Sequence, residues 1–464
     1  MSGVVPVDHA AVVPEALPRP EVAPAQPYAV PVPARRVLDN GLTVLAYDLP
    51  GQYVHAVRLA LPMPLRLEPR DREGVATIMA RTLDEGTARH TSAEFARLLE
   101  RRGVALGAGV GESGLSVDLD VAKGNLGYAL DLLRQTLIEP IFPAQEVDRH
   151  VTTRLAEIEQ ERSSAAHRAA IEFAATYFDP QARSSRPGGG TAATVGAVTR
   201  EDIAAFHARH VAPTGATLVV AGDLTGLDVA AEVEAALGGW TAGPGHVAPG
   251  EWLATPPATD RSRIVVVDRP GSVQAEIMVG CPGPDRHVPD GWAPYPMLGF
   301  LIGGSPTSRV DALLREERGF TYGMRSSFRP RRRGGLFVTA GSVRSEVTAE
   351  ALALLVEVLG GVRDGVRADE VEQAAHFLVL TAPSRYATAD AVADEAAGLS
   401  FDGLGTEFTT RTLAEVGAMD PERLAAAYRR FVDGAWTIVL VGDAASFADA
   451  VAALGIGDVT VVAN

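Results

Sequence analysis

The chain of 464 residues is too long for one ordinary hydrophobic core, which predicts more than one domain. Its formal net charge of −16 argues against nucleic-acid binding, which needs a basic face. A single cysteine, Cys281, excludes an internal disulfide and fits a reducing compartment. No apolar stretch reaches membrane-spanning length, and no basic region followed by an apolar core opens the chain, so we expect a cytoplasmic protein without membrane contact.

The first half of the chain alternates between strand and helix patterns. Residues 1–34 carry eight prolines and little periodicity, which predicts an extended arm. Thr91 and Glu94 predict a capping box for a helix that ends at Gly103. The hydrophobic pattern predicts strands at 42–47, 54–61, 104–108, 115–121 and 217–221, and helices at 73–83, 126–137 and 144–178.

The segment 303–326 is predicted to form a helix, a stop and a strand. Ser305 is a suitable N-cap followed by Pro306, and Gly319 is suited to the left-handed position after the last helical turn. The alternation of apolar residues from 320 to 324 predicts a strand. Arg315 and Tyr322 could then aim hydrogen-bond donors at one point, although an exposed helix arginine and a half-buried tyrosine would fit the local pattern as well.

The pattern of the first half returns in the second half. The Pro-Gly pair at 50–51 recurs at 270–271, and the strand ending in Gly-Asp at 222–223 recurs at 442–443. The ending of the segment LLERRG at Gly103 is matched by LREERG at Gly319. We therefore predict an α+β protein of two homologous α/β units, 35–240 and 263–464, joined by a Pro/Gly/Thr-rich linker at 241–262. Each unit is expected to have a mixed, largely antiparallel sheet flanked by helices.

Several motifs carry a family resemblance that covers about residues 35–464. DNGLTVLAYDLPG, SAEFARLLERRG and LREERGFTYG resemble segments of the insulinase-like (pitrilysin-type) zinc metallopeptidases, and the closest likeness is to their short two-domain subunits. In active members the first-half helix carries H-x-x-E-H, whose two histidines bind zinc and whose glutamate is the general base. The resemblance places Thr77, Ala80 and Arg81 in these three positions.

These replacements predict a degenerate zinc motif, with no catalytic residue in the isolated chain and no metal in it. Thr77 is a poor ligand, Ala80 cannot accept a proton, and Arg81 brings a fixed positive charge to the place of the cation. Glu157 matches the third ligand of the family by spacing and context. One carboxylate makes no zinc site, so Glu157 is expected to form a salt bridge, for example with Arg81, or to lie on a solvated helix face.

The second half keeps the motif in which the family has an arginine and a tyrosine seven residues apart. The resemblance implies that Arg315 and Tyr322 bind the substrate backbone near the scissile bond, where a guanidinium and a phenol can stabilise an oxyanion. It further implies a heterodimer with a homologous subunit that carries H-x-x-E-H and zinc, enclosing unfolded peptide substrates for processing. A substrate would add as a strand to a sheet edge.

Other motifs are interpreted as structural. His207 and His210 lack a third ligand, and the glycines at 107, 109 and 111 lead into a strand rather than a helix, so neither metal nor dinucleotide binding is expected. Residues 331–333, three arginines, are interpreted as a solvated hairpin tip.

Two alternatives to a peptidase subunit stay open. One is a structural or assembly scaffold of the core-protein type without a role in proteolysis, against which the Arg–Tyr pair argues. The other is the presequence-reading subunit of the mitochondrial processing enzyme, whose long glycine-rich loop is matched here only by the short segment 303–305. Within the peptidase interpretation, general peptide turnover and trimming of one dedicated precursor or leader peptide both fit the sequence.

Overall fold

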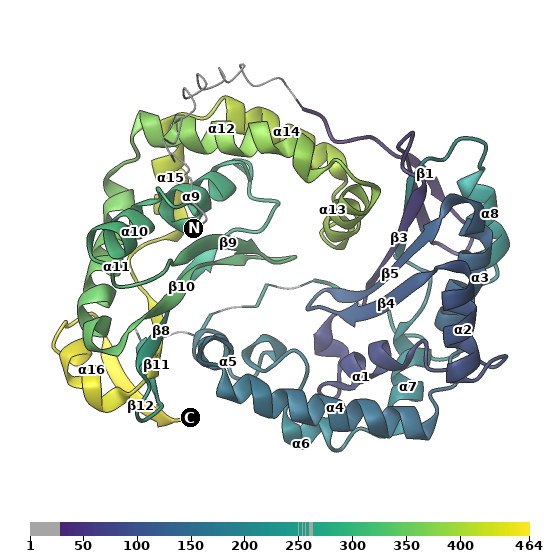
Figure 1. The fold of residues 1–464 in the computed structure, drawn as a ribbon, viewed down its shortest axis with the longest axis horizontal. Helices are drawn as coiled ribbons and strands as arrows, with labels where there is room; N and C mark the ends of the chain where they lie inside the picture. The colour runs from purple at the N-terminus through teal and green to yellow at the C-terminus, as the bar shows by residue number, and fades with distance from the viewer. Residues whose placement is uncertain (1–27, 249, 253, 256, 259–262) are drawn as a thin grey trace, which may run out of the picture.

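Two six-stranded sheets form the framework of the chain (Figure 1). The computed structural model describes residues 28–248, 250–252, 254–255, 257–258 and 263–464. The strand order is β1-β2-β6-β3-β5-β4 in the first sheet and β12-β7-β11-β8-β10-β9 in the second. The strands are β1 Ala34–Val37, β2 Thr43–Asp48, β3 Val54–Pro62, β4 Ala105–Val110, β5 Gly114–Ala122, β6 Thr217–Gly222, β7 Arg263–Asp268, β8 Gln274–Gly283, β9 Arg325–Pro330, β10 Gly335–Arg344, β11 Thr437–Gly442 and β12 Asp458–Ala463.

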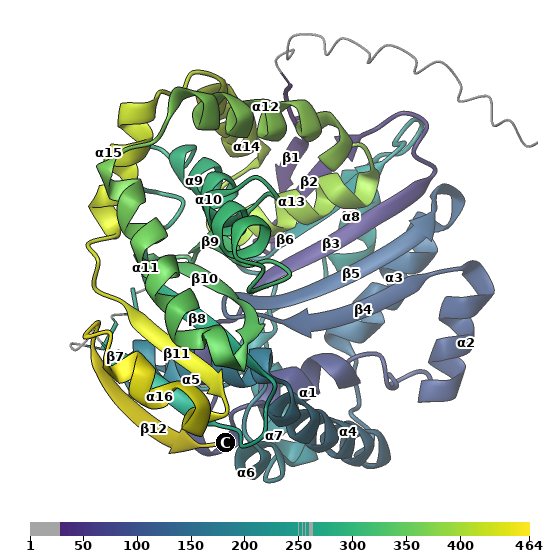
Figure 2. The same ribbon diagram turned by 60° about the vertical axis from the view of Figure 1, so that its left-hand side comes forward.

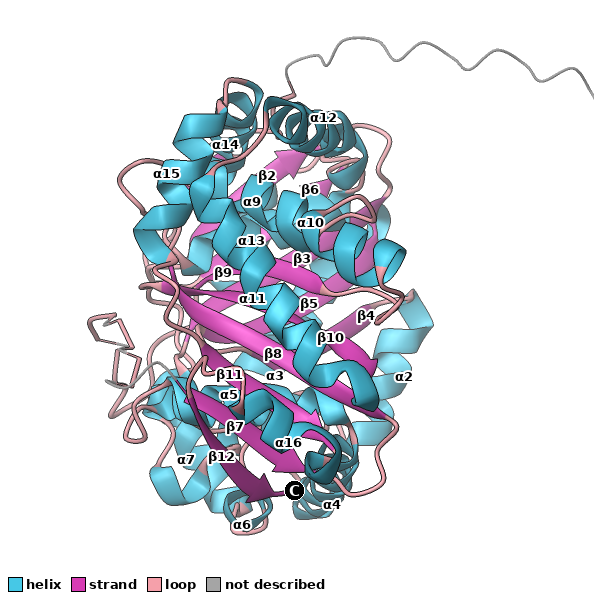
Figure 3. Ribbon diagram, turned by 90° about the vertical axis from the view of Figure 1, so that its left-hand side faces the viewer, coloured by secondary structure: helices cyan, strands magenta, loops and turns pink. Residues whose placement is uncertain are grey.

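Helices cover both faces of each sheet. In Figure 3, α11 and α16 lie over the outer face of the second sheet. Helices α3 and α8 lie on the outer side of the first sheet in Figure 1, where they contact β5 and β2. The helices of the first half are α1 Val75–Thr82, α2 Ser92–Arg102, α3 Leu126–Ile138, α4 Ala144–Ser163, α5 Ala165–Tyr177, α6 Ala192–Val195, α7 Arg200–His210 and α8 Val229–Leu237. Those of the second half are α9 Pro294–Gly303, α10 Arg309–Asp311, α11 Thr348–Asp364, α12 Ala368–Arg385, α13 Ala389–Phe401, α14 Thr406–Gly417, α15 Pro421–Phe431 and α16 Ala444–Ala452. None of the described helices is both long and apolar enough to cross a membrane.

The predicted fold class is confirmed, because the two sheets repeat one topology. Strands β2, β6, β3, β5 and β4 have the same spatial order as β7, β11, β8, β10 and β9. Among the described strands, parallel pairing is confined to β2 with β6 and to β7 with β11 and β12. The glycines that echo each other have matching left-handed backbones: φ is 88° at Gly51 and 77° at Gly271, and 60° at Gly103 and 63° at Gly319.

The two halves exchange one helix each across the pseudo-symmetric arrangement. Helix α13 of the second half packs on β3 and β6 of the first sheet (Figure 2), and α5 of the first half packs on β8 and β11 of the second. Each sheet therefore has its outer face covered by its own half and its inner face covered in part by the other half. The inner-face cores are built from Tyr47, Val219, Ala221, Val392 and Ala396 on one side, and from Phe173, Tyr177, Val267, Met278 and Val439 on the other.

The single helix predicted over 144–178 is wrong, because α4 ends and α5 begins at Ser164. Ser164 has a non-helical backbone, with φ −86° and ψ 119°, and its hydroxyl accepts a hydrogen bond from the His167 amide. Serine is a favoured N-cap, so it can both interrupt one helix and start the next. The break redirects the chain so that α5 reaches the second sheet.

The predicted elements of 303–326 also need correction. The N-cap is Ser308 rather than Ser305, and the short α10 continues as a π-helical segment, Ala312–Glu317. Residues 320–324 are an irregular loop rather than a strand, and β9 begins only at Arg325. Positive φ at Gly323 (149°) and capture of the Met324 amide by the Asp311 carboxylate (2.9 Å) keep this stretch out of the sheet.

The hairpin tip at 331–333 joins the two halves, so its interpretation as solvated is wrong for Arg331. The Arg331 guanidinium lies 4.5 Å over the Phe178 ring and pairs with Glu112 at the tip of the β4–β5 hairpin. Burial lowers the pKa of Arg331 to about 10.

A second link between the two halves comes from the N-terminal arm: the Val30 amide donates to the Thr410 hydroxyl over 3.1 Å. Of the arm predicted over 1–34, residues 1–27 lie outside the described part of the chain.

Candidate functional site

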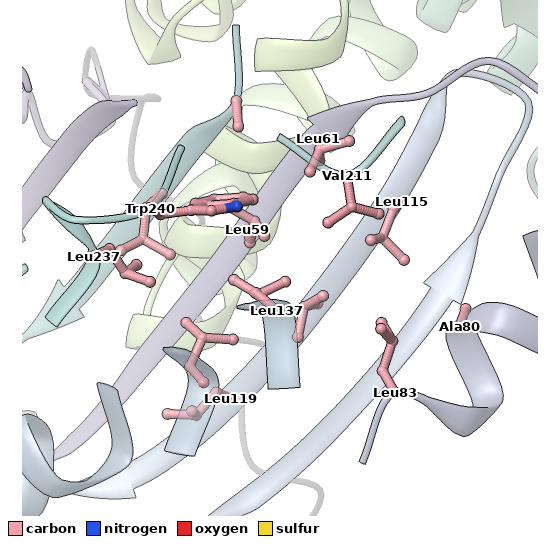
Figure 4. Close-up of a cluster of buried hydrophobic side chains, with 14 of the residues drawn as sticks. Leu59, Leu61, Ala80, Leu83, Leu115, Leu119, Leu137, Val211, Leu237 and Trp240 are labelled. Atoms are coloured by element: carbon pink, nitrogen blue, oxygen red, sulfur yellow. The ribbon is translucent and has the colours of Figure 1, made fainter. Parts of the chain in front are cut away.

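Helix α1, which carries the degenerate zinc-motif positions, is pressed against the first sheet. Figure 4 shows Ala80 on α1, and Leu83 directly after α1, in the same apolar cluster as Leu115 of β5 and Leu137 of α3. The side chains of Val75, Ile78, Met79 and Leu83 are all buried. Because these residues lie on one face of the helix, Arg81 projects from another face, toward α4.

The start of α1 is fixed by a buried carboxylate. One oxygen of Glu68 accepts hydrogen bonds from the amides of Gly74 (3.0 Å) and Ala76 (3.1 Å), and the other pairs with Arg183 at 2.8 Å. Burial raises the pKa of Glu68, although Arg183 acts in the opposite direction. A carboxylate at a helix N-terminus complements the helix dipole. The position of Arg81 is therefore set by a rigid helix and does not depend on a flexible loop.

Arg81 and Glu157 form a bidentate salt bridge. The Arg81 Nη1 and Nη2 atoms donate to the two oxygens of Glu157 over 2.9 and 2.8 Å, a fork geometry that is among the strongest ion pairs available to proteins. This hydrogen bonding lowers the pKa of Glu157, with a further contribution from Arg154 and against the effect of burial. Of the two sequence-based expectations for Glu157, the structure shows the salt bridge with Arg81.

The residues present do not fit a zinc ion. Thr77 is half-buried and offers only a hydroxyl, and the buried Ala80 offers no donor atom at all. The lone pairs of Glu157 that face α1 are occupied by Arg81, whose guanidinium does not lose its proton in proteins. In the part of the chain that the structure describes, no group of three His, Cys, Asp or Glu residues could hold a metal.

Arg154 is a member of this cluster that the sequence analysis missed. Its side chain is buried and donates to Glu157 over 3.1 Å and to Glu161 over 2.6 and 3.1 Å, and the hydrogen bond to Glu161 is the main reason that the pKa of Arg154 is raised. The signal was available, because residues at i, i+3 and i+7 share one helix face. The four side chains make a chain of alternating charge, Arg81–Glu157–Arg154–Glu161.

Arg315 and Tyr322 are both exposed, and no hydrogen bond or ion pair joins them. Arg315 lies on the π-helical segment, an element that is rare and often found at functional sites. Among the described residues, Arg315 forms an ion pair only with its neighbour Glu316, at 3.3 Å. The Tyr322 side chain is 92% exposed, which contradicts the half-buried placement that the local pattern allowed.

The loop that presents Tyr322 is nevertheless held in place on both sides. The Thr321 hydroxyl donates to the Ser342 carbonyl over 2.7 Å, and the fully buried Asp311 binds the Met324 amide and, at 3.0 Å, Arg325. Asp311 was missed by the sequence analysis, although a carboxylate beside the buried Val310 was a usable signal. Tyr322 is thus an exposed aromatic ring on an anchored backbone.

The remaining candidates take the structural places expected for them. His207 Nε2 donates a hydrogen bond to the Leu137 carbonyl over 3.0 Å, and its ring packs edge-on against Phe142. Burial lowers the pKa of His207 to about 4. His210 is buried next to Phe206. The glycines at 107 and 109 lie in β4 and 111 follows it, as expected for a strand.

Two family models match most of the chain between residues 44 and 378. Residues 44–184 match the insulinase model (Peptidase family M16), and residues 197–378 match the model described as the Peptidase M16 inactive domain. An uncharacterised zinc protease of Mycobacterium tuberculosis is 25% identical over 358 residues, which cover 76% of this chain and 79% of that protein. A non-peptidase homolog of Helicobacter pylori, YmxG, is 22% identical over 377 residues, covering 80% and 84%.

Solved structures agree with the fold. A peptidase M16 inactive domain from Pseudomonas fluorescens superposes with a TM-score of 0.81 at 23% identity, covering 88% of this chain and 97% of that one. A protease from Helicobacter pylori superposes with a TM-score of 0.79 at 17% identity, covering 89% and 100%. With the topology, the zinc-motif positions and these matches together, the chain belongs to the insulinase family, peptidase family M16, as a member whose residues at the zinc-motif positions do not fit a zinc ion.

Proposed function

We propose that this chain is the zinc-free subunit of a heterodimeric insulinase-type metallopeptidase. Its partner is a homologous chain with an intact H-x-x-E-H motif and bound zinc, and the complex cleaves unfolded peptides in the cytoplasm. This chain contributes Arg315 and Tyr322, which bind the peptide backbone next to the zinc of the partner. The isolated chain is inactive.

The observation that carries this proposal is the contrast between the two motif regions. The first is closed by its own salt bridge, because Arg81 saturates Glu157. The second presents Arg315 and Tyr322 to solvent from an anchored backbone, and neither side chain has a buried partner to stabilise. A scaffold subunit gains nothing from holding an exposed tyrosine in this way, whereas a binding site gains from donors fixed in advance.

The chemistry assigned to the pair is backbone recognition and oxyanion stabilisation. The zinc of the partner would supply an activated water, and the charge that develops on the scissile carbonyl oxygen needs hydrogen-bond donors. The Tyr322 hydroxyl donates one proton, and the Arg315 guanidinium offers a planar fork of donors. Since both residues are exposed, they can serve this purpose without disturbing the core of the chain.

The test is turnover of a quenched fluorescent peptide by the reconstituted heterodimer. Tyr322→Phe removes one hydroxyl and keeps the ring, and Arg315→Lys keeps the charge but loses the fork. Each variant should slow cleavage by roughly 100- to 1000-fold, the usual cost of one oxyanion donor. Folding and dimer formation, measured by thermal melting and size exclusion, should not change because both side chains are exposed.

Tyr53→Phe and Arg318→Lys are matched controls. Tyr53 is also an exposed tyrosine, and Arg318 lies three residues after Arg315 and pairs with Glu350 at 3.5 Å on the surface. Both controls should keep full activity. If Tyr322→Phe and Arg315→Lys also kept full activity in an intact dimer, the pair would be structural and the scaffold alternative would be correct.

A further inference from the structure

A cavity of about 510 Å³ lies at the joint between the exchanged helix α13 and the rest of the second half. Its walls are the loop 286–292 between β8 and α9, the α13–α14 connection at Leu404, helix α14, which lies beside α12 in Figure 1, and the start of α15 at Arg423. Sites for small molecules typically measure about 300 to 1,000 Å³, so the volume suits a small ligand. We call this cavity the α14 pocket.

The loop that forms one wall of the α14 pocket also holds the end of α13. The Arg286 guanidinium pairs with the carboxylate of Asp402, the buried residue that follows α13 directly. His287 Nε2 donates to the Asp402 carbonyl over 2.8 Å. A ligand in the pocket would therefore contact the segment that anchors the helix covering the first sheet.

Two aromatic rings give the pocket apolar walls. The Arg286 guanidinium lies 6.0 Å from the centroid of the Trp292 ring, and the Arg411 guanidinium lies 5.7 Å from that of Phe408. Trp292 is half-buried and lines the pocket, so a flat apolar molecule can pack on its ring. The contact with Phe408 favours one position for the Arg411 guanidinium.

The charged groups of the pocket leave one positive charge uncompensated. Asp290 pairs with Arg430, and Glu415 lies 3.4 Å from Arg423. The carboxylate at the end of α13 is paired as well, as described above. Among the residues that the structure describes, none forms an ion pair or hydrogen bond with the Arg411 guanidinium. The pocket therefore offers one free guanidinium to an anion.

The matching place in the first half is closed. There the loop between β3 and α1 packs against the short helix α6, which precedes α7 as α14 precedes α15. Val195 of α6 is fully buried, and a Cβ atom added to Gly74 would lie 2.8 Å from a methyl carbon of this valine. The α14 pocket is thus a property of the second half alone and does not follow from the repeated topology.

We propose that the α14 pocket binds a small aromatic carboxylate. The ring of the ligand packs on Trp292, and its carboxylate accepts hydrogen bonds from Arg411, whose planar fork of donors matches a carboxylate. The bound ligand contacts both the loop 286–292 and α14, so it stabilises the joint that carries α13. The site makes no use of Arg315 or Tyr322, and the inference does not depend on the proposed peptidase role.

The first test is isothermal titration of the full chain with two probes of nearly equal shape. 1-Naphthoate carries the carboxylate, and 1-naphthamide is its neutral counterpart. 1-Naphthoate should bind at least about tenfold more tightly, because a hydrogen bond to a charged group is worth more than one to a neutral group. Equal affinities, or no binding of 1-naphthoate, would overturn the proposal.

Arg411→Gln is the informative variant. It should remove the preference for 1-naphthoate and leave the affinity for 1-naphthamide unchanged. The melting temperature should stay the same, because the Arg411 side chain is exposed. Arg97→Gln, which changes an exposed arginine on α2 of the first half, is the control and should bind both probes as the wild type does.

Thr412→Trp tests the place of binding, because Thr412 lines the pocket and a larger side chain there would fill it. This variant should bind neither probe, with its folding checked by thermal melting. Hydrogen exchange of the wild type with 1-naphthoate present should show slower exchange in 286–292 and 404–415. An Arg411→Gln variant that keeps the full preference, or unchanged exchange in both segments, would place the probe elsewhere and overturn the proposal.

Discussion

Arg81 supplies a positive charge to the carboxylate of Glu157, the one residue that matches a zinc ligand of the family. A lone Glu157 on a half-buried helix face would lose hydration without gaining a partner. The bidentate pair with Arg81, extended by Arg154, removes this cost. The loss of the metal site is thus accompanied by an ion-pair network that stabilises the contact of α1 with α4.

Glu157→Gln tests this network through pH. Because the pKa of Glu157 is lowered in the folded chain, its ionised form stabilises the fold above the usual glutamate value near 4.5, and this stabilisation is lost as the pH falls below it. At neutral pH the variant should lose about 1 kcal/mol, a modest value because the carboxylate is 35% exposed. Urea unfolding at several pH values should show the difference from wild type shrinking below about pH 4.5.

Glu159→Gln is the control for this series. Glu159 lies on the same helix, but its side chain is 66% exposed and its ion pair with Arg162 is long, at 3.7 Å. Its substitution should leave stability unchanged at every pH. A Glu157→Gln variant as stable as wild type at neutral pH would show that the network contributes nothing.

At the scale of elements, the exchanged helices decide how the two halves depend on each other. Phe173 of α5 packs against β8 at Gly280, where an added Cβ would lie 2.5 Å from the Phe173 ring. The phenylalanine stacks on Tyr177 with 5.5 Å between ring centroids. A glycine in mid-strand here makes room for a ring from the other half of the chain.

Phe173→Ala should therefore destabilise the second sheet from a position in the first half. The expected cost is about 3–5 kcal/mol, as for other buried phenylalanines. Hydrogen exchange should show the greatest loss of amide protection in β8 and β11. Phe95→Ala, which opens a cavity in the core of the first half, is the comparison: its loss of protection should centre on the first sheet. Unchanged protection in β8 and β11 of Phe173→Ala would contradict the exchange.

The elements that could be predicted from the sequence are those fixed by nearby residues. The capping box of Thr91 with Glu94 and the glycine stop at Gly103 depend on residues within one turn, and both are present. The break at Ser164 has only a weak local signal, an N-cap serine inside a helical pattern, and the direction that α5 takes depends on a sheet that comes about a hundred residues later. The same holds for Arg331, whose partners Glu112 and Phe178 are distant in sequence.

In the candidate site, too, the residues that belong to a sequence motif could be predicted, and those that act through contacts with other segments could not. The resemblance pointed to Glu157 and offered Arg81 as its partner, and the structure shows the pair. Arg154 and Asp311 were not found, because their importance lies in contacts with other segments and not in a motif. The exposure of Tyr322 was not predicted, because the apolar alternation of residues 320–324 indicated a strand, whereas these residues form an irregular loop.

At the scale of the whole molecule, the two halves should stay together after the linker is cut. Cleavage at a protease site inserted after Ala248, beside the exposed Val247, breaks the chain but leaves both exchanged helices in place. Size exclusion under native conditions should show one peak containing both fragments, since each inner-face core draws on both halves. Fragments that separate without denaturant would show that the halves are independent domains.

The exchange of helices also has a consequence for biosynthesis. The first sheet is complete once Gly222 has been translated, but its inner face waits for α13, which ends at Phe401. At synthesis rates of about 5–20 residues per second, the apolar residues Tyr47, Val219 and Ala221 stay uncovered on the ribosome for roughly ten seconds or more. The nascent first half is therefore a client for chaperones that shield apolar surface, and ribosome pauses placed before α13 would lower the yield of this protein more than pauses placed after it.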